Sequence, residues 1–522
     1  MAGRVSGEFS VSLRLNFLVC IPIRPMYMYT SVFFLILIFI KYMAKFNTKS
    51  PKAKTLTENL AGGQAYKQSD ELALASVLLT SFVSDQFYRG ASDTLSEVKS
   101  LLSKVDPVFA AKAAIYARDR FGMRSITHAL AGEIAPLASG AEWGKSFYEK
   151  VVSRPDDMTE ILSYYLSKNG NGKVKFPNSI KKGFAAAFDK FDDYQIAKYK
   201  MANRDFKLVD VVNIVHPIPT DRNKEALSLL IADKLKSTDT WEAKLSSAGQ
   251  VAGNAEELEQ LKSDAWAELV STRKIGYFAL LRNLRNIIQQ APDAIPVACD
   301  MLVDAKLISK SKVLPFRFAT AYEEISRLGG TKEVRDVLVA INKALEVSVM
   351  NVPKLDNCLV VMDVSGSMMG KPSEIASLFG AILAKVNSCD VMTFAESARY
   401  MSYNPLDSVM SIRNSFRFSG GGTNFPSIFK TAKKSYDNII ILSDMQGWIG
   451  YDTPTKEFNE WKKKTGANPH VFSWDLAGYS TMQFPENQVY CLAGFSEKVF
   501  DVMELLKTDR NALVNEIKAI EL

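Results

Sequence analysis

The stretch "VVMDVSGSMMG", residues 360–370, decides how the C-terminal part of this chain is interpreted. Three apolar residues run directly into Asp363, and Ser365 and Ser367 follow at alternate positions. A buried strand that ends in this way presents several side-chain oxygen atoms at one place. Such a cluster is typical of a metal site, a phosphate site or a nucleophile.

Further short, β-rich apolar runs follow the same design. They span residues 358–362, 390–394, 438–442 and 470–474, with helical patterns at 371–386 and 425–436 between them. Strands that alternate with helices and are apolar on both faces predict a parallel sheet covered on both sides. We therefore expect residues 354–522 to form a doubly wound α/β domain, which would bind ligands at the carboxyl ends of its strands.

The pattern from residue 69 to about 350 is helical throughout. Ser69 and Asp70 are typical helix caps, Asp106 followed by Pro107 begins a further helix, and Gly122 marks a break. Successive helix pairs without intervening strands indicate an α-solenoid of HEAT type over residues 43–353, although no fixed repeat period is visible. The chain is thus predicted to be multidomain.

Composition narrows the possible functions. The 522 residues suffice for about three domains, and 64 Lys+Arg against 57 Asp+Glu give a net charge of +7, which allows a local basic face for phosphates. Three histidines are too few for a His-rich metal site. GxxxxGK[ST], HExxH and GxSxG motifs are absent from the sequence.

The five cysteines are scattered singly, without CxxC or zinc spacing: Cys20, Cys299, Cys358, Cys389 and Cys491. This usage predicts buried, reduced thiols in a cytoplasmic protein.

Residues 1–42 differ in character from the rest of the chain, because "SVFFLILIFI" (31–40) is intensely apolar. A bilayer span needs about 20 apolar residues, and Pro22, Arg24 and Pro25 interrupt the flanking sequence. We favour translation from Met43, with residues 1–42 a non-native extension, because a polar, basic segment begins there. The alternative is a marginal N-terminal membrane anchor.

Three segments are expected to meet at the ends of the strands: "DVSGS", the glycine-rich "GGGTNF" (420–425) and "SDMQ" (443–446). The side chains that they would bring together are Asp363, Ser365, Ser367, Thr423 and Asp444. Hard oxygen donors of this kind suit Mg²⁺ or another divalent cation. This set, in this order, resembles the metal-ion-dependent adhesion site of von Willebrand factor A (vWA) domains.

The residues of the same loop fit a catalytic function less well than a metal site. An Asp363 nucleophile of the haloacid-dehalogenase phosphatase type needs a second carboxylate two residues later, where Ser365 stands. A Ser365 nucleophile has no histidine near it in sequence. We therefore expect a protein that is not an enzyme.

The helical half shows a second resemblance. "TENLAGGQAY", "AAIYARDRFGMRSITHALA", "DVVNIVHPIP", "YFALLRNLRNI" and "LPFRFATAYE" together look like the TROVE module of the Ro autoantigen family, and the order of helical module and C-terminal vWA domain is similar too. The resemblance implies helical repeats closed into a ring that the vWA domain bridges. It further implies binding of the single-stranded 3′ ends of misfolded small non-coding RNAs in the ring and of Y-like RNA on the outer surface. The implied role is non-catalytic RNA quality control, with an exoribonuclease as a possible partner.

Cations set within the helices are the candidate RNA contacts, because guanidinium and ammonium groups bind phosphates and guanidinium planes stack on bases. They are Arg118, Arg120, Arg124, His128, Arg282, Arg285, Lys312 and Arg317. Arg282 and Arg285 are three residues apart and share a helix face. His216 matches a histidine that the family places beside its RNA surface, whereas Asn213 stands where the family has an arginine.

Two other hypotheses remain open. In one, the helical part is a scaffold and the metal site captures an acidic residue of a protein ligand. In the other, residues 1–42 anchor an adhesion protein to a membrane.

Overall fold

The structure, a computed structural model, describes residues 56–81, 90–170, 174–200, 206–236, 241–311, 313, 315–349, 352, 354–450, 452–485, 489–494 and 498–522. The chain divides into two units, residues 1–52 and 53–522, and the described residues all belong to the second. The predicted extension or anchor, residues 1–42, lies outside them, as do Met43 and Lys312. Within the described ranges, no helix is both long enough and apolar enough to cross a bilayer.

Helices make up the N-terminal part, as predicted. They are α2 (Asp70–Thr80), α3 (Ala91–Leu102), α4 (Pro107–Asp119), α5 (Ser125–Ala138), α6 (Gly144–Val151), α7 (Pro155–Asn169), α8 (Asn178–Ala187), α9 (Asp193–Lys198), α10 (Leu208–Val215), α11 (Lys224–Ile231), α12 (Trp241–Val251), α13 (Ala255–Ser271), α14 (Tyr277–Gln290), α15 (Ile295–Val303), α16 (Ala305–Ser311), α17 (Pro315–Ser326) and α18 (Lys332–Ser348), with short 3₁₀ turns η1 (Phe188–Lys190) and η2 (Pro292–Ala294).

Local sequence explains where these helices begin and end. Helix α4 starts at Pro107 because the Asp106 carboxylate accepts a hydrogen bond from the Val108 N–H at 2.9 Å. Gly122, with φ of 66°, separates α4 from α5. Helices pack mainly on near neighbours in sequence, such as α4 on α5, α6 on α8 and α17 on α18. The helical series is confirmed, whereas the HEAT-type solenoid and its closure into a ring stay predictions.

The C-terminal part alternates strands and helices. It contains β3 (Cys358–Asp363), η3 (Gly366–Met368), α19 (Lys371–Asn387), β4 (Asp390–Phe394), β5 (Ala398–Met401), α20 (Val409–Ser415), α21 (Pro426–Thr431), β6 (Asn438–Ser443), α22 (Pro454–Thr465), β7 (His470–Asp475), β8 (Thr481–Met482), β9 (Tyr490–Ala493), α23 (Lys498–Leu506) and α24 (Ala512–Lys518). All four predicted strands are present.

Six of these strands form one mixed sheet in the order β5-β4-β3-β6-β7-β9. Neighbouring strands are parallel except β4 and β5, which are antiparallel. This is the order of a doubly wound sheet, in which the chain leaves the first strand, β3, toward one edge and later continues from its other side. The order in which the chain adds strands therefore changes direction between the parallel neighbours β3 and β6. The carboxyl ends of these two strands flank the crevice where such sheets bind ligands.

The sheet lies between two apolar layers because side chains alternate along each strand. In β3, Leu359 and Val361 join the smaller core, which covers one face. Val360 and Met362 point to the other face and join a core that continues into the helices of the N-terminal part. One face of the sheet therefore shares its core with the helical part.

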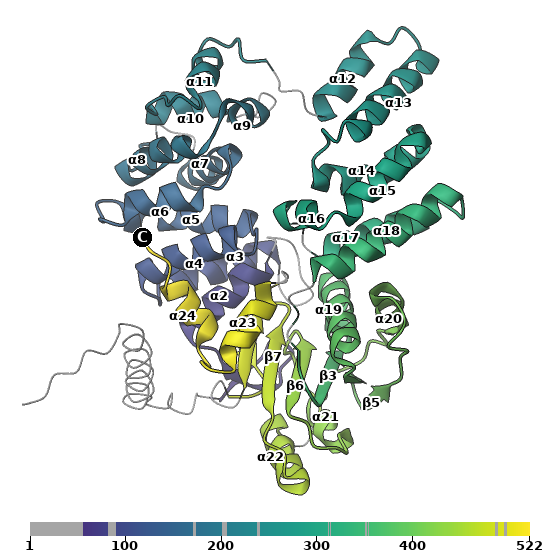
Figure 1. Cartoon of the computed structure of the whole chain (residues 1–522). Coiled ribbons are helices and arrows are strands. Elements are labelled where there is room, and N and C mark those ends of the chain that lie inside the picture. Colours follow the sequence, from purple (N-terminus) through teal and green to yellow (C-terminus); the bar gives the residue numbers. More distant parts are fainter. Residues whose placement is uncertain are drawn as a thin grey trace, which may run out of the picture. The chain divides into compact units, whose positions relative to one another are not determined.

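The α/β part packs against both the first and the last helices of the helical part (Figure 1). Helix α19 lies against α17, and Arg413 of α20 forms an ion pair with Glu323 of α17 at 2.5 Å. At the other end of the series, α24 lies against α2 and α4, and Lys518 forms an ion pair with Glu71 at 2.6 Å.

A small second sheet joins distant parts of the chain. Strands β1 (Leu56–Glu58) and β2 (Gln64–Lys67) form a hairpin, and β2 pairs with β8. The hairpin turn also meets the loop after β6, since the Asn59 amide donates to the Gly447 carbonyl at 2.7 Å and the Leu60 N–H donates to Gln446 Oε1 at 2.8 Å. The hairpin thereby covers one side of that loop.

The prediction that all cysteines are reduced thiols is wrong for two of them, because Cys358 and Cys389 form a disulfide with Cα atoms 5.0 Å apart. Strand register explains the pairing: Leu359 lies beside Asp390 in adjacent parallel strands, so the preceding residues are neighbours too. Among the described residues, Cys299 and Cys491 lie outside this disulfide, and both are half-buried, so the predicted full burial is wrong for them.

The disulfide leads to a stability prediction. It closes a loop of 31 residues, for which chain entropy gives a stabilisation of about 3–4 kcal/mol. We expect Cys358→Ala/Cys389→Ala to lower the free energy of unfolding by roughly that amount in denaturant titrations without reductant. Cys299→Ala serves as the control. Equal stability of the double variant and the wild type in both the presence and absence of dithiothreitol would contradict the prediction.

Candidate cation site and nucleic-acid interface

The first loop of the candidate cation site begins at the end of β3. Asp363 is fully buried, and its Oδ1 accepts a hydrogen bond from the Ser365 N–H at 2.9 Å. Its Oδ2 accepts one from the Ser443 hydroxyl at 2.6 Å. The hydroxyls of Ser365 and Ser367 lie 3.4 Å apart. Ser443, the last residue of the neighbouring strand β6, was not among the predicted residues, yet it fixes the orientation of this carboxylate.

The third predicted loop follows β6. Asp444 is fully buried, and its Oδ1 accepts a hydrogen bond from the Gln446 N–H at 3.2 Å. Its other oxygen, Oδ2, is buried and has no hydrogen-bond partner in the part of the chain that the structure describes. An unpartnered carboxylate oxygen in the interior is costly unless a ligand satisfies it.

The glycine-rich loop that carries Thr423 is tied to both of the others. The Gly366 N–H donates to the Gly421 carbonyl at 3.1 Å, and the Gly420 N–H donates to the Val364 carbonyl at 3.2 Å. The Thr423 carbonyl accepts from two N–H groups of the loop after β6, each at 3.1 Å. Gly421 has φ of 85°, which favours glycine. All five predicted residues therefore lie on three loops that are hydrogen-bonded together.

Without a cation, negative charge on Asp363 and Asp444 is unfavourable, because both carboxylates are buried and they repel each other. Burial raises the pKa of Asp363 despite the hydrogen bond from Ser443. Burial also raises the pKa of Asp444, and the negative charge of Asp363 raises it further. A divalent cation between the two would remove this repulsion. Two carboxylates and three hydroxyls are a hard-oxygen donor set of the kind Mg²⁺ accepts. Among the described residues, no group of three or more His, Cys, Asp or Glu side chains is placed to hold a metal ion.

The predicted RNA contacts fall into separate places. Arg118 and His128 are only 7% and 6% exposed and both bind the Asp157 carboxylate, at 2.8 and 2.9 Å. Arg124, half-buried, pairs with Asp156 at 2.8 Å and lies 3.6 Å from Asp157. For Arg118 and His128 the geometry contradicts a phosphate contact, because both side chains are enclosed and already satisfied.

Arg120 and His216 are exposed at helix ends. Arg120 is the C-cap of α4, and His216 is the C-cap of α10 in the left-handed region, with φ of 49°.

Arg282 and Arg285 lie on α14 and Arg317 lies on α17, a helix that packs against α14, whereas Lys312 is outside the described residues. Arg282, Arg285 and Arg317 are exposed, and within the described part of the chain none of them forms an ion pair. The Arg317 guanidinium lies 5.7 Å from the ring centroid of Phe278, which is 44% exposed. Burial and the positive charge of Arg282 lower the pKa of Arg317, so the two cations are close enough to repel each other. We call Phe278, Arg282 and Arg317 the α14–α17 patch.

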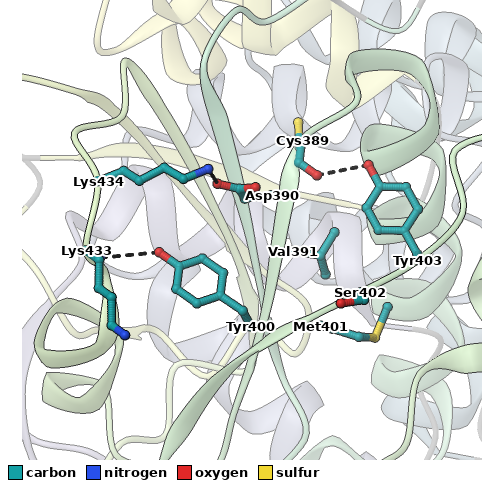
Figure 2. Close-up of a pocket in the computed structure, with 9 residues that line it drawn as sticks. All are labelled: Cys389, Asp390, Val391, Tyr400, Met401, Ser402, Tyr403, Lys433 and Lys434. Carbon is teal, nitrogen blue, oxygen red and sulfur yellow. Dashed lines mark hydrogen bonds and ion pairs between the residues drawn. The ribbon is translucent and has the colours of Figure 1, made fainter.

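A cavity of about 430 Å³ lies at the opposite, amino-terminal end of strand β4. Figure 2 shows its lining, in which Lys434 points to Asp390 and the Lys433 N–H points to the Tyr400 hydroxyl. Asp390 also accepts from Tyr436. Its carboxylate is thus satisfied by protein groups, and the cavity is separate from the candidate cation site.

These features define a two-part protein: a helical module with an exposed cation–aromatic patch, joined to an α/β domain that gathers oxygen donors at its switch point. A family profile described as "TROVE domain" matches residues 72–226 and 231–369, and the chain belongs to this family. The resemblance to the Ro family is thereby confirmed.

Individual relatives agree with this assignment. The chain is 23% identical over 497 residues to "RNA-binding protein RO60" of Deinococcus radiodurans, covering 83% of this chain and 92% of that protein. It is also 23% identical over 348 residues to "Telomerase protein component 1" of Mus musculus, covering 50% of this chain but only 13% of that relative's length. The crystal structure of the Deinococcus radiodurans RO (RSR) protein superposes with a TM-score of 0.54 at 18% identity, covering 86% of this chain and all of that one, which shows a common fold.

Proposed function

We propose that this protein is a non-catalytic RNA-binding protein that captures the single-stranded 3′ ends of misfolded or structured small non-coding RNAs in RNA quality control in the cytoplasm. The observation that carries the proposal is the α14–α17 patch, where exposed cations lie beside an exposed aromatic ring. Phosphates neutralise such cations, and a base stacks on such a ring. Membership of the TROVE family, with a relative named as an RNA-binding protein, supports it.

A Y-like RNA on the outer surface is a further part of this proposal. Exposed His216, at a position that matches the family histidine, supports such a contact. An exoribonuclease joined through that RNA would be the natural protein partner.

We also propose that the α/β part is a vWA domain with a Mg²⁺ site at Asp363, Ser365, Ser367, Thr423 and Asp444. Its support is the doubly wound strand order, the position of the three loops at the switch point and the unpartnered Oδ2 of Asp444. A bound cation would supply positive charge that neutralises the two carboxylates and attracts an anionic group of a ligand.

One observation favours a second function for that site, the capture of an acidic side chain of a protein ligand. Met369 and Trp448, on two of the loops, are 55% and 53% exposed. Exposed large apolar side chains are typical of surfaces that contact proteins. This function can coexist with RNA binding because it uses a different surface.

The RNA proposal is tested by isolating the protein from its own cells at moderate salt and sequencing the bound RNA, alongside binding of a labelled RNA hairpin with and without a single-stranded 3′ tail. We expect tail-dependent binding that Arg282→Ala/Arg285→Ala weakens about tenfold or more, because two charge-assisted contacts are lost. Arg399→Ala/Lys464→Ala, which removes two exposed cations elsewhere, is the matched control. A wild-type protein free of RNA and without affinity for the tailed hairpin would overturn the proposal.

A further inference from the structure

The α14–α17 patch has a neighbour in the α/β part. Two cations lie close to the Phe316 ring of α17: the Arg317 guanidinium carbon is 4.8 Å from its centroid, and the Lys371 ammonium nitrogen is 4.1 Å from it. Arg317 belongs to the helical part, whereas Lys371 is the first residue of α19. Two halves of the protein therefore place cations around one aromatic ring.

The ion pair that Lys371 forms is weak. Its ammonium group pairs with Glu374 at 2.9 Å, one turn along the same helix, and both side chains are partly exposed. Ion pairs of this exposed, local kind are weak and are readily exchanged for a ligand phosphate. The Phe316 contact, by contrast, fixes where the ammonium group stands.

These contacts form a series in which aromatic rings and cations alternate. From α14 to α19 it consists of the exposed Phe278 ring, the Arg317 guanidinium 5.7 Å from that ring, the buried Phe316 ring and the Lys371 ammonium. Arg282 adds positive charge beside Arg317. An exposed aromatic face flanked by cations is what a single-stranded nucleic acid needs, since its bases stack and its phosphates require positive charge.

We propose that Phe278, Arg317 and Lys371 form one composite site for single-stranded RNA, in which the α/β part contributes the Lys371 contact to a phosphate and Phe278 stacks on a base. This inference rests on the proposed RNA-binding function and adds to it a residue outside the helical module. Lys371 comes four residues after Ser367, a span of at most about 14 Å. A strand held at Lys371 therefore passes beside the candidate cation loops.

The experiment measures the affinity of the full chain for a labelled oligoadenylate of about 12 nucleotides between about 50 and 200 mM salt. Phe278→Ala is expected to weaken binding about 5- to 150-fold with an unchanged salt slope, because it removes stacking and no charge. Lys371→Gln is expected to weaken binding and to make the slope of log K against log salt less steep by about 0.7, the value for one phosphate contact on a single strand. Lys371→Arg, which keeps the charge, should restore the slope.

Lys462→Gln is the matched control. Lys462 also lies over a phenylalanine ring, 5.4 Å from the centroid of Phe458, but on α22. If the wild type binds and Lys371→Gln keeps the slope of this control, the composite site is wrong while the proposed function stands. If the wild type binds no single-stranded RNA, the proposed function itself fails. Phe278→Trp, which keeps a stacking ring, should bind like the wild type, and tenfold weaker binding by that variant would contradict the stacking role.

Discussion

The Asp157→Ala variant is expected to lose about 3–5 kcal/mol of unfolding free energy, the cost of breaking a buried ion pair from one side. The carboxylate is completely buried and binds Arg118 at 2.8 Å and His128 at 2.9 Å. It also accepts hydrogen bonds from the N–H groups of Ser153 and Arg154 at the start of α7, at 3.0 and 2.9 Å. Its removal leaves the Arg118 charge buried without a partner.

Denaturant titration of the variant measures this loss. Asp221→Ala is the control, since Asp221 also pairs with a cation, Lys224 at 2.9 Å, but is 96% exposed and is expected to contribute less than about 1 kcal/mol. A loss of stability in Asp157→Ala no larger than that of the control would contradict a structural role for the cluster and return Arg118 and His128 to the candidate RNA contacts.

The same cluster sets a pH dependence. Burial alone would raise the pKa of Asp157, but the hydrogen bond from His128 and the positive charge of Arg118 hold it well below its usual range. A depressed pKa in the folded state contributes stability above the unfolded value, near pH 4, and loses it as pH falls further. The difference in unfolding free energy between the wild type and Asp157→Asn should therefore shrink as pH is lowered below about 4.

Mg²⁺ is expected to raise the free energy of unfolding of EDTA-treated protein by about 2.7 kcal/mol when its concentration is 100 times the dissociation constant. The reason is the pair of buried carboxylates, Asp363 and Asp444, whose mutual repulsion a bound cation would relieve. Asp444→Asn should show two changes at once. It should lose the response to Mg²⁺, and in EDTA it should be at least as stable as the wild type, because one of the two like charges is gone.

Thermal melts with and without Mg²⁺ measure both effects. Asp390→Asn is the matched control, because Asp390 lies at the opposite end of the same sheet and is paired with Lys434 at 2.6 Å. It should keep the full Mg²⁺ response. If Asp444→Asn responds to Mg²⁺ as the wild type does, the cation binds elsewhere and the proposed site is wrong.

The candidate cation loops could be predicted because their information is local. Asp363 follows a run of apolar residues, and the ends of parallel strands meet at one edge whatever the details of packing. The hydrogen bond from Ser443 to Asp363 could not be predicted from local sequence. Its role depends on β6 lying directly beside β3, a pairing between residues about 80 positions apart.

The arginines show the opposite case. A helix that is apolar all round is buried, and "AAKAAIYARD" around Arg118 carries that signal, which the prediction of a phosphate contact overlooked. Its partner Asp157 is 39 residues away and has no local mark. Phe278 and Lys371 were missed because an exposed aromatic ring and a helix-starting lysine are ordinary in sequence. Their place in a common binding site can be inferred only from the fold, which packs α17 against both α14 and α19.

The β1–β2 hairpin also has a consequence for how this protein is made. Its third strand, β8, is reached only at Thr481, more than 400 residues after Lys67, its partner in register. At about 5–20 residues per second, a ribosome needs roughly 20–80 s to cover that distance. During this time β2 lacks its partner strand β8, so one edge of the hairpin is unpaired. For most of that time the loop after β6, which the hairpin turn contacts in the folded protein, has not been synthesised either. The loops proposed to hold the cation thus acquire their N-terminal cover late in synthesis, when nearly the whole chain exists.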